Sequence, residues 1–269
     1  MGWVSPLLRY VVSSMALAAL VDVAFYGMLT SGDVVVRTAA FLAWGGLRMY
    51  SPTVAVILAA GIKAVREALR IDARAAVMYL TSPLVAYLAL AFYYLIAASM
   101  GVAKPLPTST LLVALVGGYI AAITINALFA LGEEVGWRGF LQARLEAAGF
   151  SLTKAAVVTG VVWGFWHAPA ILLIGHNYPE SRPLGVFLFP LLTTAFSYPM
   201  AVVRRVSSSA FPCASLHGAI NAVWGLAVAA TDLPKEVGGL GLLAVVAWVF
   251  TSVIIYLLVH SVDSWRAKS

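Results

Sequence analysis

Runs of about 20 apolar residues recur along this chain, and they constrain its fold more than any other feature. A helix of this length crosses the hydrocarbon core of a bilayer with all of its backbone hydrogen bonds satisfied internally. The 269 residues are 62% hydrophobic and only 10% charged, whereas about a quarter of a soluble domain is charged. The mean hydropathy is +0.95. These observations predict an all-α, polytopic membrane protein.

We expect one transmembrane domain, residues 1–269, of about eight helices. The expected spans are about 7–30, 38–62, 76–99, 108–133, 152–174, 184–203, 207–230 and 237–260. Arg48 and the sequence "SPT" at 51–53 interrupt the second span and predict a break or a tilt there. The first run is too long for the apolar region of a signal peptide and is followed by more spans, so we expect it to be retained.

The basic residues predict how the chain is oriented in the membrane. With the N-terminus in the cytoplasm, 12 of the 17 Lys and Arg residues fall in cytoplasmic connections, as the positive-inside rule requires. The twelve are Arg9, Lys63, Arg66, Arg70, Arg74, Arg138, Arg144, Lys154, Arg204, Arg205, Arg266 and Lys268. We therefore expect a multi-pass protein of the cell membrane with both termini in the cytoplasm. This loop charge also accounts for the net charge of +6, so we expect no nucleic-acid partner.

Ionisable side chains are costly inside a spanning helix, so each is a candidate functional residue. These candidates, together with one amide, are Asp22, Arg48, Glu133, Glu134, Arg138, His167, His217 and Asn221. We interpret Asp22 and Arg48 as structural, with Asp22 able to pair with Arg37 or Arg48. His176 lies in the loop sequence "GHNYPESRP", and we expect it to be solvated.

The stretch "ALFALGEEVGWRGFLQARL" (127–145) places two adjacent carboxylates at the end of an apolar run. Glu134 and Arg138 are four residues apart, in the order that favours a helical ion pair. Glu133 lies about 100° around the helix and has no local cation. An unpaired carboxylate next to hydrocarbon suits a general base. The alternative is that both acids are solvated at a wet helix end. The predicted orientation puts this end, and the opening of a site here, on the cytoplasmic side.

A buried histidine lies in "VVWGFWHAPAIL" (161–172). Pro169 lacks an amide donor and would clash with the carbonyl of Phe165, so the helix should kink beside His167. A single histidine in a membrane helix can also serve only as an interhelical hydrogen-bonding group.

A second histidine lies in "LHGAINAVWG" (216–225). His217 and Asn221 are four residues apart and share one face of the seventh helix, where such donors could hold an oxyanion. Gly218 leaves room for a close approach by another helix or by a substrate backbone. Interhelical hydrogen bonding remains the alternative for this pair too.

In order and spacing, "EEVGWR" (133–138), a Trp–His167 element and "HGAIN" (217–221) resemble the motifs of the CPBP (or ABI) family. This family of CAAX proteases and bacteriocin-processing enzymes includes the Ras-converting CAAX prenyl endopeptidase. Its pattern is EExxxR, FxxxH and HxxxN or a similar residue, each on a separate membrane helix. The resemblance covers about residues 108–225, which is the expected catalytic core. One departure is Trp163, where the family usually has Phe; it could keep the packing role or narrow the cavity.

The resemblance implies an intramembrane endopeptidase that cleaves a membrane-associated or lipidated protein or peptide near the cytoplasmic face. For a CAAX-type substrate the cut would be C-terminal to a lipidated cysteine. Glu133 and His167 would polarise the attacking water, while His217 and Asn221 would stabilise the oxyanion. Glu134 and Arg138 would support the geometry of the site.

The sequence leaves the role of a metal open. Two histidines and a glutamate match the ligand count of a catalytic zinc site, which would use Glu133, His167 and His217. The chain has no HExxH motif, and Asn221 suits an oxyanion donor better than a zinc ligand. We therefore favour metal-independent, glutamate-assisted hydrolysis, with zinc as the alternative.

Other chemistries and functions compete with this interpretation. Cys213 could reach His217 and form a Cys–His dyad, whereas Ser215 lies on the wrong side of that helix. Buried Glu and His residues also occur in proton-coupled transporters, although inverted repeats are not evident here. A non-catalytic binding or immunity protein on the same scaffold is a third possibility.

Overall fold

The computed structural model describes residues 4–266, and its regular secondary structure within this range is helical apart from one isolated β-bridge. The predicted positions of both termini fall on residues 1–3 and 267–269, which lie outside the described residues. The elements are α1 (Val4–Leu29), α2 (Val34–Ala60), α3 (Ile62–Ala68), α4 (Ala73–Thr81), α5 (Leu84–Ser99), α6 (Thr108–Ala122), α7 (Ile125–Glu134), the π-helix η1 (Val135–Gln142), α8 (Ala143–Ala147), α9 (Leu152–Trp166), α10 (Ala168–Ile174), α11 (Arg182–Ser207), α12 (Phe211–Ala229) and α13 (Leu242–Arg266).

The helices confirm an all-α, multi-pass membrane protein. Within residues 4–266, seven helical segments are long and apolar enough to cross a membrane, or eight when the bent pair α6 and α7 counts as one span. The described helices match the eight expected spans in order and place, with boundaries shifted by a few residues.

The second span shows no break, because α2 continues through Arg48 and Pro52; the expected tilt stays a prediction. Contacts with α7 and η1 stabilise α2 around Pro52. The Oγ1 of Thr53 donates a hydrogen bond to the carbonyl of Gly132 on α7, at 2.6 Å. Pro52 lies so close to Gly136 that a Cβ at this glycine would come within 2.6 Å of the proline side chain. A neighbouring helix thus supports the turn that the proline weakens.

The fourth span also differs, because it is bent by 50° between α6 and α7. Thr124 lies at this break, and its hydroxyl donates a hydrogen bond to the carbonyl of Ile120, at 2.6 Å. Threonine offers the backbone this alternative partner, and such bonds often bend helices. Beyond Glu134 the chain forms η1 and then α8, so the helical path extends past the predicted end at residue 133.

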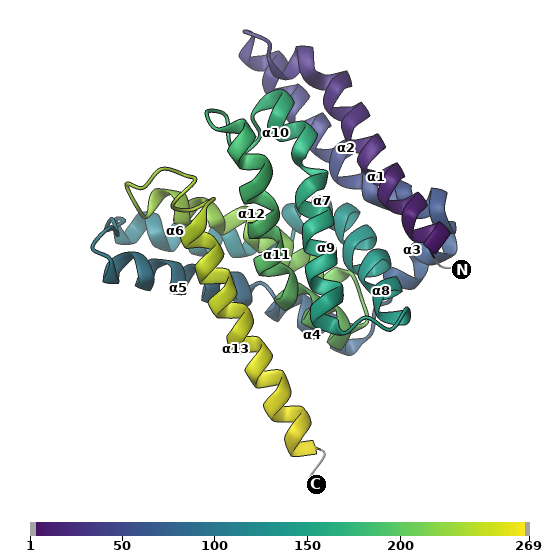
Figure 1. Ribbon diagram of the computed structural model, residues 1–269. Coiled ribbons are helices and arrows are strands. Elements are labelled where there is room, and N and C mark those ends of the chain that lie inside the picture. Colours follow the sequence, from purple (N-terminus) through teal and green to yellow (C-terminus); the bar gives the residue numbers. More distant parts are fainter. Residues whose placement is uncertain (1–3, 267–269) are drawn as a thin grey trace.

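The helices gather around a central pair, α9 and α11, which pack along each other (Figure 1). Their close approach depends on Gly160, where a Cβ would lie 2.6 Å from the Cα of Thr194. The α1–α2 hairpin lies on one side of this pair, and α5 and α6 lie on the other (Figure 1). The C-terminal part of α13 extends beyond the bundle (Figure 1).

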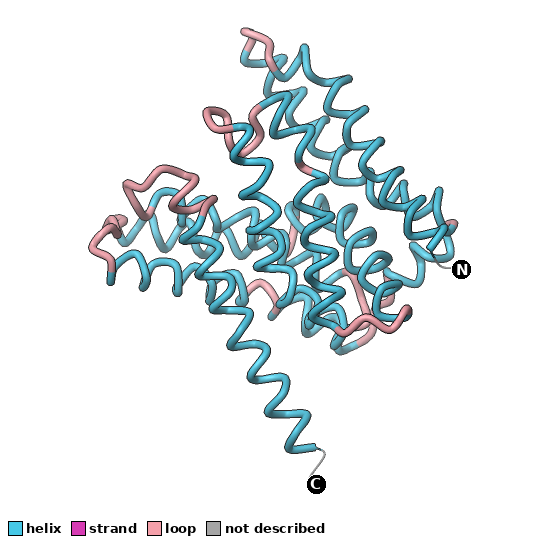
Figure 2. The backbone as a smooth tube through the Cα atoms, in the orientation of Figure 1, coloured by secondary structure: helices cyan, strands magenta, loops and turns pink. Residues whose placement is uncertain are grey.

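The connecting loops gather at two opposite ends of the bundle (Figure 2). At one end, which we call the basic end, the backbone amide of Ala210 bonds to the carbonyl of Ala68. Its loops and helix ends carry the basic residues Lys63, Arg66, Arg70, Arg74, Arg144, Lys154, Arg204 and Arg205. At the other end Tyr178 donates to the carbonyl of Leu240, which joins loop 175–181 to loop 230–241. The positive-inside rule predicts that the basic end is cytoplasmic.

Candidate active site

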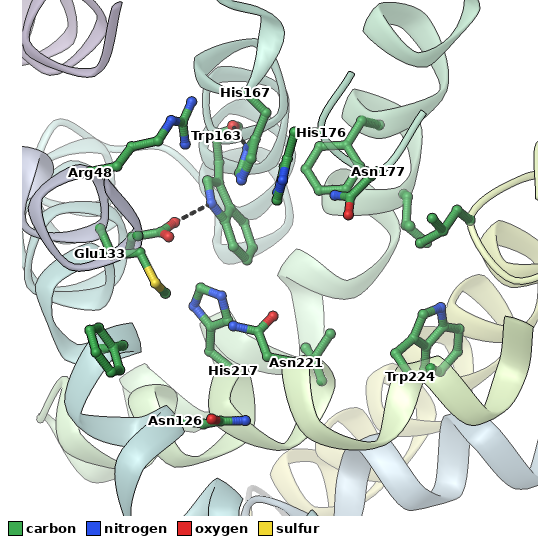
Figure 3. A pocket seen from close by; sticks show the side chains of 18 of the residues that line it. Arg48, Asn126, Glu133, Trp163, His167, His176, Asn177, His217, Asn221 and Trp224 are labelled. Atoms are coloured by element: carbon green, nitrogen blue, oxygen red, sulfur yellow. Dashed lines mark hydrogen bonds between the residues drawn. The ribbon is translucent and has the colours of Figure 1, made fainter. Parts of the chain in front are cut away.

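A cavity of about 580 Å³ lies inside the bundle, between α2, α7, α9, α11, α12 and α13 (Figure 3). All four residues predicted to be catalytic line this one cavity: Glu133, His167, His217 and Asn221. Arg48 lines the same cavity, and these five side chains come from four separate segments of the chain. The rest of the wall is mainly aromatic and aliphatic. The structure brings the four together, while their roles in a reaction stay predictions.

Glu133 lies in the last turn of α7 and is only 3% exposed. Its Oε2 accepts two hydrogen bonds, from the indole N–H of Trp163 at 2.6 Å and from that of Trp137 at 3.1 Å. The sequence predicted a carboxylate without a cation, and neither of these donors is charged. A buried carboxylate held by neutral donors remains available as a proton acceptor.

Glu134 and Arg138 form the predicted ion pair, and both are fully buried. The Nη1 of Arg138 lies 3.0 and 3.2 Å from the two carboxylate oxygens, and its Nη2 donates to the Oγ of Ser197 at 3.0 Å. The pair bridges the start of η1, and π-helical turns are frequent at functional sites. The sequence did not predict a third partner: the Nδ1 of His217 lies 2.9 Å from Glu134 Oε1. Glu134 therefore orients both Arg138 and His217.

These contacts also assign protons on the two histidines. His167 Nδ1 lies 3.0 Å from the carbonyl oxygen of Trp163. A carbonyl only accepts, so Nδ1 carries the proton and Nε2 of the neutral ring is an acceptor. His217 Nδ1 donates to a carboxylate, so its Nε2 can donate only when the ring is an imidazolium. The Glu134 carboxylate stabilises that cation, as an acid does in a catalytic triad.

His167 occupies the break between α9 and α10, as the sequence predicted. Pro169 falls in the first turn of α10, where the missing amide costs nothing. The imidazole packs edge-on against Trp166 and Phe189, with ring centroids 4.8 and 4.5 Å away. The interrupted helix and these rings hold the histidine at the cavity wall.

His217 and Asn221 lie on one face of α12, next to the break between α6 and α7 (Figure 3). Gly218 permits this contact, because a Cβ there would come within 2.6 Å of the carbonyl oxygen of Ala122. Asn126 donates from Nδ2 to the carbonyl of Gly218, at 3.1 Å. The close approach expected of Gly218 is thus confirmed, with helix rather than substrate as the neighbour. Within residues 4–266 the Asn221 amide has no hydrogen-bond partner, so it can donate to a bound group.

Arg48 is a cavity residue that the sequence interpretation treated as structural only. It forms the predicted pair with Asp22, with Nε 2.8 Å from Oδ1, and Trp44 donates to the same oxygen at 2.7 Å. Its Nη2 donates to the carbonyl of Trp166, the residue before His167, at 2.8 Å. Arg48 therefore ties the α1–α2 hairpin to the helix break at the site.

His176 was expected to be solvated, and this expectation is wrong. The chain reverses at Gly175 and returns His176 to the cavity wall. Its ring lies nearly parallel to that of His167, with centroids 6.2 Å apart, and edge-on to Trp44. Burial and the nearby Arg48 cation lower the pKa of His176 to about 3, so its ring is neutral. In the sequence, the glycine directly before His176, Gly175, was the only sign that the chain reverses here.

Cys213 does not lie on the cavity wall. It is fully buried, and its thiol donates to the carbonyls of Met200 and Ser209, at 3.6 and 3.9 Å. The Ser215 hydroxyl is likewise turned to the carbonyl of Pro212, at 3.0 Å. Neither side chain is presented to a substrate in the cavity, which disfavours the Cys–His alternative.

We expect Cys213→Ser to keep its catalytic rate within about twofold, because only a buried contact changes. Initial rates on any peptide that the unmodified protein cleaves would measure this. If a Cys213→Ser variant that stays folded no longer cleaves the peptide, the alternative in which Cys213 is the nucleophile would be supported.

The zinc alternative is not supported by the positions of its proposed ligands. Within the described residues, no group of three or more His, Cys, Asp or Glu side chains is arranged to hold a metal ion. The Oε2 of Glu133 and the Nδ1 atoms of His167 and His217 are engaged within the protein, but a histidine that ligates a metal through Nε2 also donates from Nδ1 in this way. Metal-independent hydrolysis therefore stays a prediction.

The cavity reaches the end of the bundle opposite the basic end. His176 and Asn177 of loop 175–181 line it, and so does Leu240 of loop 230–241. No loop of the basic end contributes to the described wall. The expected cytoplasmic opening of the site and the expected orientation of the chain both stay predictions.

Comparison with known proteins finds a family match over the part of the chain that holds most of this site. Residues 110–223 match the family described as type II CAAX prenyl endopeptidase Rce1-like. Over 60 residues the chain is 34% identical to the "CAAX prenyl protease 2" of Methanococcus maripaludis. This match covers 22% of the present chain and 21% of the relative, so it spans about a fifth of either protein. The family match includes Glu133, His167, His217 and Asn221. Residues 110–223 of this multi-pass membrane protein are therefore similar to type II CAAX prenyl endopeptidases of the Rce1-like family.

Proposed function

We propose that this protein is an intramembrane endopeptidase that hydrolyses a peptide bond with a water activated by Glu133 and His167. The observation that carries the proposal is that these residues share one cavity with His217 and Asn221, inside a domain of an endopeptidase family. The name of the methanococcal relative, "CAAX prenyl protease 2", supports a CAAX-type substrate. For such a substrate we propose cleavage C-terminal to the lipidated cysteine.

Water activation follows from the acceptors that face the cavity. Glu133 accepts a proton from the water, and the Nε2 of neutral His167 accepts the hydrogen bond from its other O–H. The oxygen then attacks the carbonyl carbon of the peptide bond. General-base assistance of this kind contributes about 10² to 10⁴ in rate.

The tetrahedral intermediate needs donors for its oxyanion. The Asn221 amide supplies one donor, and His217 supplies another as an imidazolium held by Glu134. Glu133 then returns its proton to the amide nitrogen, the carbon–nitrogen bond breaks, and the carboxylic acid passes its proton to the amine, so the products are a carboxylate and an ammonium group. A donor aimed at an oxyanion in a site shielded from water is worth about 10² to 10³ in kcat.

The cavity wall supports an apolar, membrane-derived substrate. Aromatic rings make up much of it: Phe41, Trp44, Phe129, Trp163, Phe189, Phe196, Trp224 and Trp248. Cavities of this kind bind ligands mainly through apolar contact and use a few polar groups to orient them. A lipidated or strongly hydrophobic peptide fits such a wall better than a soluble one.

Cleavage of matched peptides by the purified protein tests this proposal. We expect a farnesylated CAAX peptide to be cut at a single bond, identified by mass spectrometry, and its unlipidated counterpart to be cut more slowly. If folded protein cleaves neither these nor other hydrophobic peptides, the endopeptidase proposal is wrong. Solute uptake into proteoliposomes would then favour the transporter alternative.

Treatment with a chelator tests whether cleavage is independent of a metal ion. We expect 1,10-phenanthroline or EDTA to leave the cleavage rate within about twofold, because a protein carboxylate supplies the base. A known zinc peptidase assayed in the same detergent serves as the control for chelation. Loss of activity that added zinc restores would contradict a metal-independent reaction.

A further inference from the structure

We propose that Trp163 is a positioning residue, whose indole N–H holds one oxygen of Glu133 so that the other is aimed at the attacking water. This inference rests on the proposed function and assigns a specific role to the residue that departs from the family pattern. Trp163 stands where the family usually has Phe, which has no N–H to donate.

The first support is the contact itself. The Nε1 of Trp163 lies 2.6 Å from Glu133 Oε2, and Trp137 donates to the same oxygen at 3.1 Å. Hydrogen bonds to an ionised carboxylate are shorter and stronger than neutral ones. Two donors on one oxygen leave it little capacity for a further partner near the plane of the carboxylate.

The second support is the other oxygen. Within residues 4–266, Oε1 of Glu133 has no hydrogen-bond partner, and Glu133 lines the cavity. The terminal torsion of a glutamate is broad, so an untethered carboxylate would rotate and present either oxygen. Anchoring of Oε2 removes this freedom before the substrate arrives, which is how preorganised groups contribute to rate.

The third support is that the indole is itself immobilised. Trp163 is only 2% exposed, and the Arg138 guanidinium lies over its ring with Cζ 4.4 Å from the centroid. His217 and Phe196 pack edge-on, with centroids 5.0 and 5.1 Å away. A ring confined in this way cannot turn its N–H away from the carboxylate. Trp163 thus contacts the base, the structural ion pair and the oxyanion histidine.

We expect Trp163→Phe to lower kcat by about 10- to 100-fold, since it removes a hydrogen bond to a charged group that orients the base. KM should change by less than about threefold, because an aromatic ring still lines the cavity at this position. The loss should be partial, because Trp137 still donates to the same oxygen.

Trp248→Phe is the matched control. Trp248 lines the same cavity, but within the described residues its Nε1 has no hydrogen-bond partner. The same truncation there removes no bond to Glu133, so any effect should fall on KM rather than on kcat. Trp137→Phe should resemble Trp163→Phe with a smaller loss, because its donor lies farther from Oε2.

Indole N–H signals of ¹⁵N-tryptophan-labelled protein test the contact without any substrate. Glu133→Gln should shift the signals of Trp163 and Trp137, assigned from the two Phe variants, and leave that of Trp248 in place. If the Trp163 signal does not move, or if Trp163→Phe cleaves at the full rate, the inference is overturned while the endopeptidase proposal stands. If the unmodified protein cleaves no peptide, the proposed function fails, and the spectra still decide whether the indole holds Glu133.

Discussion

Glu133→Gln is expected to reduce kcat by roughly a hundredfold to ten-thousandfold, the range attributed to a general base. The amide has nearly the same shape and can still accept the indole hydrogen bonds through its carbonyl oxygen. It has almost no capacity to take a proton from water. Rates on a farnesylated peptide would measure the loss, and thermal unfolding in detergent would show that the fold is intact.

Glu67→Gln provides the control for this substitution. Glu67 is exposed on α3, away from the cavity wall, so its replacement should leave both rate and stability unchanged. If Glu133→Gln cleaves as fast as the unmodified protein, Glu133 is not the base, and the proposed water activation is wrong.

Arg138→Met is expected to cost about 3–5 kcal/mol of stability, because it removes the guanidinium that pairs with the fully buried Glu134 carboxylate. The long apolar side chain keeps most of the volume, and His217 becomes the remaining partner of Glu134, so the cost comes from the lost ion pair. Denaturant unfolding in mixed micelles, followed by circular dichroism, would measure it. Little of this variant should accumulate in membranes.

Replacing both partners separates stability from catalysis. Because apolar residues can replace a buried ion pair at little cost, Glu134→Leu with Arg138→Met should regain most of the lost stability. The double variant should nevertheless be inactive, since His217 loses the carboxylate that its Nδ1 contacts. If Arg138→Met alone is as stable as the unmodified protein, the pair does not support the site.

Much of the fold could be predicted because the bilayer imposes simple rules on sequence. Apolar runs gave the spans, and Pro169 gave the break beside His167. The spacing of Glu134 and Arg138 gave their ion pair. The spans follow from composition over about 20 residues, while the break and the ion pair depend on residues within about one helical turn.

The remaining features depend on contacts between distant segments. The bend at Thr124 lies where α12 presses Gly218 against the helix break. The bond between Glu134 and His217 joins residues 83 positions apart. Neither leaves a periodic signal along the chain.

The missed role of Trp163 has a similar cause. Its family position suggested packing, and packing is one part of what the ring does. Its hydrogen bond to Glu133 depends on how α7 and α9 face each other, 30 residues apart in the chain. His176 was misjudged because a short helix and a reversal at Gly175 return a loop residue to the cavity.

An experimental structure of the Glu133→Gln variant with an uncleaved peptide tests the central claim most directly. We predict that the scissile carbonyl oxygen lies within hydrogen-bonding distance of Asn221 and His217, with its carbon facing position 133 and His167. A peptide bond held elsewhere, or these four side chains turned to separate neighbours, would contradict the account.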